Sequence, residues 1–376
     1  MLMAGIQNVP VASPSLSRDD MTMKMVGVSQ TIPLGGKLAL RTRTAEHELT
    51  AAGARLAETR LAVARDVRSA YFDLVFATRA FEITTRTQGA LADLVTATAA
   101  RYAAGGGRQT EALRARVEAA RMADDASALA EARRASLARL NALLQRPADA
   151  PIESDAIPTS VVRAALGDTA RRTRFVSPML GARVADSPLP PLDSLQALVV
   201  RLSPRLAERR AMMAAQTTRE ELARRERRPD IDVSLQYGQR AARADMVSAI
   251  VSLELPIQRS RRQDAMVAEA RSERAAAAAD VDAEATVLRA EVARWYGEIE
   301  RARAQLLLLT TAVLPNARAT LASAAAGLQA GRGEFAELID AQAAVFNAEV
   351  EYHRALTDFA KSLAELEAAA GTEVLQ

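Results

Sequence analysis

Two periods of hydrophobic residues alternate along the chain. At 230–239, apolar side chains occupy every second position and polar residues or glycine stand between them. An extended chain places these two sets on opposite faces. The same alternation follows at 246–257, and the segments 1–10 and 21–33 are the equivalents near the start of the chain. The pattern predicts four β-strands of about ten residues each, which is the length of a tilted transmembrane β-strand.

A heptad pattern fills the long segments between the strands. Steps of four and three residues separate the apolar positions Leu288, Val292, Trp295, Ile299, Ala302, Leu306, Leu309 and Val313. The same spacing runs from Val63 to Phe81. Such a seam winds helices around one another as a coiled coil. We therefore expect long helical hairpins at 36–146 and 259–369, with a bend or local loosening at Pro315, which cannot donate a helical hydrogen bond.

The two halves of the chain repeat one plan at an offset of about 225 residues. Val28–Pro33 aligns with Val251–Pro256, and Val67–Tyr71 aligns with Val292–Tyr296. Each half contains two strands, a long helix, a glycine-rich turn and a returning helix. The chain is therefore expected to be an internal duplication.

This duplication divides the chain into three segments. The first repeat covers 1–146 and the second covers 193–376. A proline-rich, irregular connection at 147–192 joins them, in which a short helix near 160–172 is an open alternative. The second repeat opens with a helix at 193–228, before its strand pair. The first repeat has no counterpart of that helix, because its first strand already begins at Met1.

Composition excludes several classes of function. The chain has no cysteine, which excludes thiolate metal sites, and its two histidines, His47 and His353, cannot form a multi-histidine metal centre. Its formal net charge is only +3, and no clustered basic face suggests nucleic-acid binding. No catalytic triad, phosphate loop or paired acid–base site stands out. We therefore assign no catalytic residue, cofactor or metal site, and do not expect an enzyme.

Four strands cannot close a barrel in a membrane, because lipid does not tolerate an open sheet edge. A symmetric trimer with three sets of four strands forms a twelve-stranded barrel, a size found in outer membranes. The same symmetry assembles the long helices into a hollow tube. The expected fold is mainly α: antiparallel coiled-coil hairpins form an α-barrel, and four strands per protomer complete a β-barrel. This architecture predicts a duct.

Several motifs resemble the TolC family of outer-membrane efflux proteins. They are the strand-to-helix stretch Val28–Lys37, the turn Arg101–Gly105, the stretch Ala330–Ala341 and the segment from Pro204 to Ile231. From Asp20–Met25 onward, the chain is similar to the heavy-metal subgroup, which includes the CusC and CzcC proteins. The resemblance implies a homotrimer in outer-membrane lipid with a periplasmic extension. It also implies docking to a periplasmic adaptor (membrane fusion protein) and an inner-membrane RND-type pump.

The resemblance implies passive export of heavy-metal cations, such as copper and silver or cobalt, zinc and cadmium. Family members begin with an export signal, often followed by a lipid-bearing cysteine, and neither precedes Met1. The missing first helix fits this observation. We therefore expect that the sequence starts at an internal methionine and is truncated at its N-terminus.

The resemblance also places functional residues near the hairpin turns. Glu337 and Asp340 fall where the family carries acidic residues at the periplasmic constriction, and their i, i+3 spacing puts them on one helix face. Three copies would ring the pore with carboxylates that favour cations. The alternative is an ordinary solvated helix face. Four glycines permit tight chain reversal and, by resemblance, mark tips that contact the adaptor: Gly105, Gly107, Gly331 and Gly333.

Methionines near the start of the chain raise the question of copper, because thioethers suit Cu(I). They are Met1, Met3, Met21, Met23 and Met25. Alternation with Val26 and Val28 predicts that the last three point to the lumen. Strand methionines are also ordinary apolar filler, and a duct gains little by holding its cargo tightly. We therefore assign no metal site to them.

Two other functions remain open at this point. One is a soluble coiled-coil scaffold, in which the four strands form a small sheet and nothing crosses a membrane. The other is the periplasmic adaptor of the same kind of pump, which normally carries one helical hairpin with flanking β-domains. The presence of two strand pairs between two helical hairpins favours the channel over both.

Overall fold

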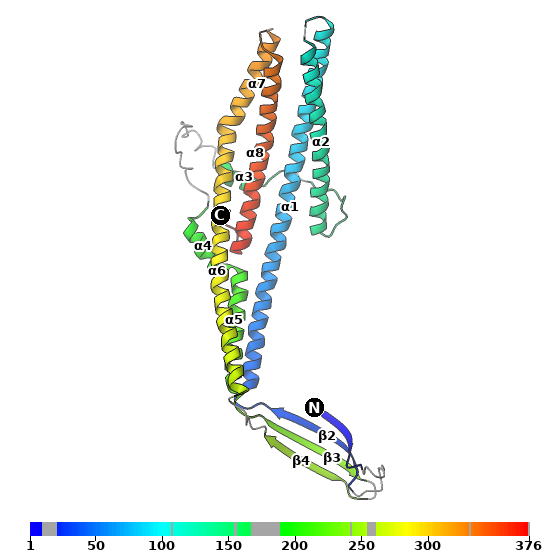
Figure 1. Ribbon diagram of the computed structural model, residues 1–376, viewed down its shortest axis with the longest axis vertical. Coiled ribbons are helices and arrows are strands. Elements are labelled where there is room, and N and C mark those ends of the chain that lie inside the picture. The colour runs from blue at the N-terminus through cyan, green and yellow to red at the C-terminus, as the bar shows by residue number, and fades with distance from the viewer. Residues whose placement is uncertain are drawn as a thin grey trace. The chain divides into compact units, whose positions relative to one another are not determined.

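The computed structural model describes residues 1–9, 21–106, 108–153, 156–166, 189–240, 243–253, 261–330 and 332–374. This part of the chain is mostly helical, with four antiparallel strands in a single sheet (Figure 1), which confirms the predicted fold class. Packing divides the chain into two compact units. We call them the sheet unit (Met1–Arg55 and Arg205–Glu284) and the hairpin unit (Leu56–Pro204 and Ala285–Gln376). Each unit takes segments from both halves of the sequence.

The sheet joins the two halves of the sequence edge to edge. Its strands are β1 (Leu2–Gln7), β2 (Met23–Ile32), β3 (Ile231–Arg240) and β4 (Met246–Leu253), paired in that order. The central pair, β2 and β3, is in register from Met23 opposite Arg240 to Ile32 opposite Ile231. Met21, predicted within a strand, precedes β2. The last residues of the strand predicted at 246–257 lie outside the described residues.

Helices make up most of the rest of the described chain. They are α1 (Lys37–Ala103), α2 (Gln109–Leu143), α3 (Thr159–Leu166), α4 (Leu192–Leu202), α5 (Pro204–Arg225), α6 (Gln263–Leu308), the π-helix η2 (Leu309–Val313), α7 (Leu314–Gln329) and α8 (Phe335–Ala370). The prediction of one helix at 193–228 was wrong. Ser203 has extended backbone (φ −58°, ψ 124°), because a following proline disfavours the α conformation, and Pro204 then starts α5.

The hairpin unit is held together by the predicted seams. Leu288, Val292, Ile299, Ala302 and Leu306 are each at most 1% exposed. On the other hairpin, Ala70 and Leu74 of α1 pack with Leu140 of α2 in a buried cluster. Small and branched apolar residues at heptad spacing thus bury one stripe of each helix.

The helix is locally loosened into a π-helix just before Pro315. Pro315 stands in the first turn of α7, directly after the π-helix η2. A proline has no N–H to donate to the carbonyl four residues earlier, and the wider π-turn accommodates that missing bond. The hydroxyl of Thr311 donates to the carbonyl of Leu307 at 2.6 Å within this turn. Beyond it, α7 packs beside α8 (Figure 1).

One helical stretch has the length and composition of a membrane-spanning helix. Among the described residues, Gln263–Gln329 contains an 18-residue window with mean hydropathy 1.2, of which 11% is buried. A single helix of this kind is weak evidence of a membrane span, since core helices of soluble proteins share these properties.

Candidate functional sites of the sheet and hairpin units

The sheet has one apolar and one largely polar face. Residues directly opposite each other in an antiparallel pair share a face, so the register assigns every strand residue. The apolar face carries Leu2, Ala4, Ile6, Val26, Val28, Ile32, Ile231, Val233, Leu235, Tyr237, Val247, Ala249, Val251 and Leu253. It is interrupted by Lys24, Gln30 and Gln239.

The apolar side chains of this face remain open in the single chain. Leu2 is 75% exposed and Val251 is 71% exposed, and their neighbours are exposed in the same way. The opposite face carries Gln7, Ser29, Thr31, Asp232, Ser234, Gln236, Arg240, Ser248 and Ser252, together with methionine, glycine and Ile250. A continuous exposed apolar surface of this extent marks a lipid or protein interface.

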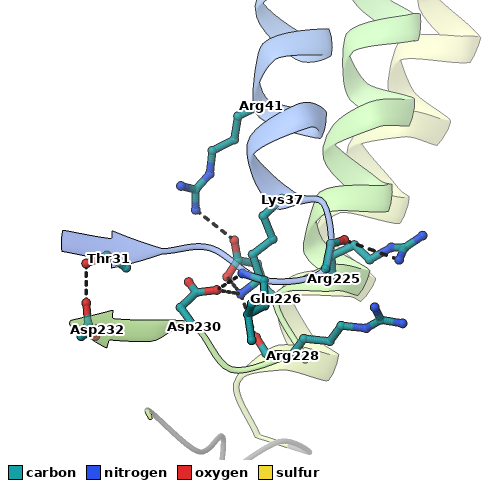
Figure 2. A network of polar contacts seen from close by, with 10 residues as sticks. Thr31, Lys37, Arg41, Arg225, Glu226, Arg228, Asp230 and Asp232 are labelled. Carbon is teal, nitrogen blue, oxygen red and sulfur yellow. Dashed lines mark hydrogen bonds and ion pairs between the residues drawn. The ribbon is translucent and has the colours of Figure 1, made fainter. Parts of the chain in front are cut away.

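A buried lysine connects the junction between β2 and α1 with the junction between α5 and β3 (Figure 2). Lys37, the first residue of α1, is 1% exposed. Its ammonium donates to Oδ1 of Asp230 at 2.8 Å and to the carbonyl of Arg228 at 2.7 Å, and lies 3.4 Å from Oε2 of Glu226. Oδ1 of Asp230 also accepts the backbone N–H of Leu34 at 3.1 Å. Three acceptors thus satisfy a cation that would otherwise be costly to bury.

Hydrogen-bond donors and positive charges around Asp230 favour its ionised form. Burial acts to raise the pKa of Asp230, but the hydrogen bonds from Lys37 and from the Leu34 amide, with the charges of Lys37 and Arg41, outweigh it. The pKa therefore lies below its ordinary value. Arg41 adds an ion pair to Glu226 at 3.3 Å, visible in Figure 2.

Two glycines shape the chain before Lys37. Gly35 and Gly36 have φ of +75° and +80°, which favours glycine. A Cβ at Gly35 would lie 2.8 Å from Cδ of Arg228, so the two junctions approach closely here. Sequence reasoning treated Lys37 only as the end of a motif. The sequence feature that could have identified Lys37 is its place in the first turn of a helix, where the helix dipole disfavours a cation.

The start of α8 fixes the direction of the predicted acidic pair. Phe335 and Ile339 are 3% and 5% exposed and pack in one buried cluster with Leu91 of α1 and Ala115 of α2. Glu337 and Asp340 lie on the other side of α8 and are exposed. The candidate constriction residues are thus presented together, away from the packing between hairpins.

The hairpin turns use glycine in two different ways. Gly105, after α1, has a φ of +76°. Gly333, before α8, accepts no side chain, because a Cβ would lie 2.8 Å from the backbone nitrogen of Leu328 and 2.9 Å from the carbonyl carbon of Gly327. The other two predicted tip residues, Gly107 and Gly331, lie outside the described residues.

His353 lies in the hairpin unit beside charged groups. It borders a cavity of about 350 Å³ together with Arg79, Glu82 and Arg86. Burial, followed by the positive charge of Arg79, lowers the pKa of His353 below its ordinary value, although Glu349 and Glu82 act in the opposite direction. Among the described residues, no group of three or more histidine, aspartate or glutamate side chains could hold a metal ion.

The comparisons with known proteins cover both repeats. The profile of a family described as outer membrane efflux protein matches residues 1–145 and 197–372. The chain belongs to this family. A comparison with curated proteins found no match.

Solved structures of the outer-membrane efflux fold are similar to nearly the whole chain. VceC of Vibrio cholerae has a TM-score of 0.76 at 16% identity and covers 100% of this chain and 86% of its own. The open-state MtrE channel of Neisseria gonorrhoeae has a TM-score of 0.76 at 18% identity, with 100% and 81% covered. CusC has a TM-score of 0.78 at 15% identity, with 99% and 82% covered. At these identities the likeness concerns the fold.

Family membership confirms the TolC-type outer-membrane efflux protein expected from the sequence motifs. It places the protein in the outer membrane and favours a channel over a soluble scaffold or a periplasmic adaptor. The two-faced sheet is the feature that such a protein needs for contact with lipid on one side and with water on the other.

Proposed function

We propose that three copies of this chain form the exit duct of a tripartite efflux system. The observation that carries this proposal is the sheet, which is apolar on one face, largely polar on the other, and open at both edges. Within the described chain, β1 pairs only with β2, and β4 pairs only with β3. Three protomers joined edge to edge satisfy the backbone groups of these edges and give a closed twelve-stranded barrel.

In this arrangement the apolar face contacts lipid and the polar face lines the lumen, while the long hairpins form the wall of a helical tube. The duct is passive, and the pump supplies the energy. The proposed partners are a periplasmic adaptor and an inner-membrane RND-type pump. The turns that contain Gly105, Gly107, Gly331 and Gly333 are the proposed adaptor contacts.

The proposed cargo is heavy-metal cations, and the proposed constriction is formed by Glu337 and Asp340. Both carboxylates are exposed on one face of α8, and neither has an ion-pair partner among the described residues. Three copies would place six unpaired carboxylates around the axis. Such a ring attracts cations and repels anions at close range.

Single-channel recordings of the purified protein in planar bilayers test the duct and its constriction together. We expect a pore that prefers cations, from a particle whose mass by light scattering equals three chains. Glu337→Gln with Asp340→Asn should lower the cation-to-anion permeability ratio. The matched control is Asp124→Asn with Asp125→Asn, which removes two exposed carboxylates from α2. A protein that forms no pore would refute the duct, and an equal effect of the two variants would remove Glu337 and Asp340 from the constriction.

The cargo is tested in the native cell. Deletion of the gene should raise the sensitivity of the cell to copper and silver, or to cobalt, zinc and cadmium, and the wild-type gene should restore resistance. A deletion strain with unchanged metal sensitivity would refute the heavy-metal assignment and leave the duct in place.

A further inference from the structure

Four methionines lie on the polar face of the sheet. Met25 of β2 stands opposite Gly5 of β1 and Gly238 of β3, and Gly238 in turn stands opposite Met246 of β4. Met23 lies two residues from Met25 on the same face, and Met3 of β1 lies diagonally next to Met25. Strands are spaced by about 4.8 Å and same-face residues by about 6.7 Å, so Met23, Met25 and Met246 surround Gly238, whereas Met3 lies on the far side of Met25, three strands away from Met246.

Glycines form the floor between these methionines. A Cβ at Gly238 would lie 2.7 Å from Sδ of Met23, so the thioether of Met23 lies over Gly238, in the row that connects Met25 and Met246. Met3, Gly5, Met25 and Gly27 border a hollow of about 280 Å³ on the same face. Long unbranched side chains beside residues without side chains have room to converge.

The positions of these methionines differ from those expected for apolar filler. The apolar face of the described strands is built from valine, leucine, isoleucine, alanine and tyrosine and contains no methionine. All four strand methionines lie instead among serine, glutamine, threonine, aspartate and arginine on the other face. If methionine served here only as apolar filler, we would expect it on the apolar face as well as on the polar face.

We propose that Met23, Met25 and Met246 form a binding site for a soft monovalent cation, Cu(I) or Ag(I), above Gly238. Thioethers are soft ligands that select Cu(I), whereas carboxylate, carbonyl and water suit hard cations. The nearest charged neighbour, Arg240, lies opposite Met23, but its guanidinium donates to the carbonyl of Ala244 at 2.6 and 2.9 Å. That contact directs the positive charge toward the turn.

The inference deepens the proposed function, because it rests on a polar face that borders the lumen and names the cation class that this lumen would bind. The binding itself is a property of one sheet. It can be measured on the purified protein without any transport.

The test is a titration of the full-length protein, purified in detergent and labelled with [methyl-¹³C]methionine, with silver nitrate. The methyl resonances of Met23, Met25 and Met246 should shift together and saturate at one Ag(I) per chain. Met23→Leu, Met25→Leu and Met246→Leu combined keep the apolar volume but remove the three thioethers, and should weaken Ag(I) binding at least tenfold.

The matched control is Met212→Leu with Met266→Leu. These residues lie on helices of the same sheet unit and are 37% and 39% exposed, compared with 38% for Met246. The control should bind Ag(I) as the wild type does. If all exposed methionines shift in parallel, or if the triple variant binds equally well, the inference is overturned. Binding without a pore in bilayers would instead refute the duct alone, whereas a pore without binding would refute the metal site alone.

Discussion

Lys37→Met is the most informative substitution in the sheet unit, because it removes a buried charge and keeps most of the side-chain volume. The carboxylates of Asp230 and Glu226 and the carbonyl of Arg228 would lose their shared donor. The junctions β2–α1 and α5–β3 would then be held by Arg41 and by the backbone bonds of the sheet. We predict local opening of both junctions.

The size of the effect follows from the three acceptors. Hydrogen bonds to charged groups contribute about 1.5–3 kcal/mol each, and removal of one partner of a buried ion pair costs about 3–5 kcal/mol. The carboxylates of Asp230 and Glu226 retain 24% and 27% exposure, so water replaces part of the loss. We therefore expect about 3 kcal/mol, at the low end of the range for a buried pair. This corresponds to about a hundredfold in the local opening equilibrium.

Hydrogen exchange followed by mass spectrometry measures this opening. Peptides that cover residues 28–40 and 226–236 should lose about a hundredfold in protection, while a peptide from 335–345 in the hairpin unit should be unchanged. Lys361→Met is the matched control, since Lys361 pairs with Asp73 at 2.7 Å but is 34% exposed. It should cost at most about 1 kcal/mol.

A double variant tests the coupling directly. Lys37→Met with Asp230→Asn should cost less than the sum of the two single variants, because each removes the same interaction. Unchanged protection at the junctions in Lys37→Met, or additive costs in the double variant, would refute the role given to this lysine.

Three further predictions concern pH and the hairpin turns. The lowered pKa of Asp230 means that its contribution is present above the ordinary value of 3.8 and is lost as pH falls through the lowered value. Junction protection should therefore be level from pH 8 to 5, and a loss near pH 6 would contradict this. Because the pKa of His353 is lowered in the folded chain, falling pH protonates this histidine in the unfolded chain before it does so in the folded chain. The hairpin unit should therefore lose stability as pH falls below about 6.5. His353→Gln should flatten that dependence in urea unfolding, and an unaltered slope would exclude His353 as its cause. Gly333→Ala should lower exchange protection at the start of α8 by about 1–3 kcal/mol, since its Cβ meets backbone. Gly106 lies in the turn between α1 and α2, and a Cβ there would have only one neighbour, at 3.9 Å. Gly106→Ala should therefore leave exchange protection unchanged, and an equal loss of protection in the two variants would contradict the packing argument.

The strands and the long helices were predictable because a single spacing of hydrophobic residues dominates each segment. The alternation from Ile231 to Tyr237 and the seam from Leu288 to Leu309 are local patterns, and burial of one face follows from them directly. The break before α5 was also readable, since Pro204 disfavours helix at Ser203, but the apolar pattern on both sides obscured it.

The contacts of Lys37 could not be predicted from the sequence. Its partner Asp230 lies 193 residues away, and nothing local to either residue specifies the pairing. The clustering of the methionines was also only partly predictable from the sequence. Alternation predicted that Met23 and Met25 share the polar face, whereas Met246 joins them only through a register set by β3. The positions of Glu337 and Asp340 came from a resemblance, and their function remains a prediction.

Cysteine scanning of β3 in native outer membranes shows whether one face of the sheet borders lipid and the other borders water. The chain has no cysteine, so each substitution introduces a single thiol. Val233, Ser234, Leu235 and Gln236 are changed one at a time and treated with a membrane-impermeant maleimide. We expect labelling at 234 and 236 and protection at 233 and 235. Equal labelling at all four positions would show that water reaches both faces, and would contradict the channel.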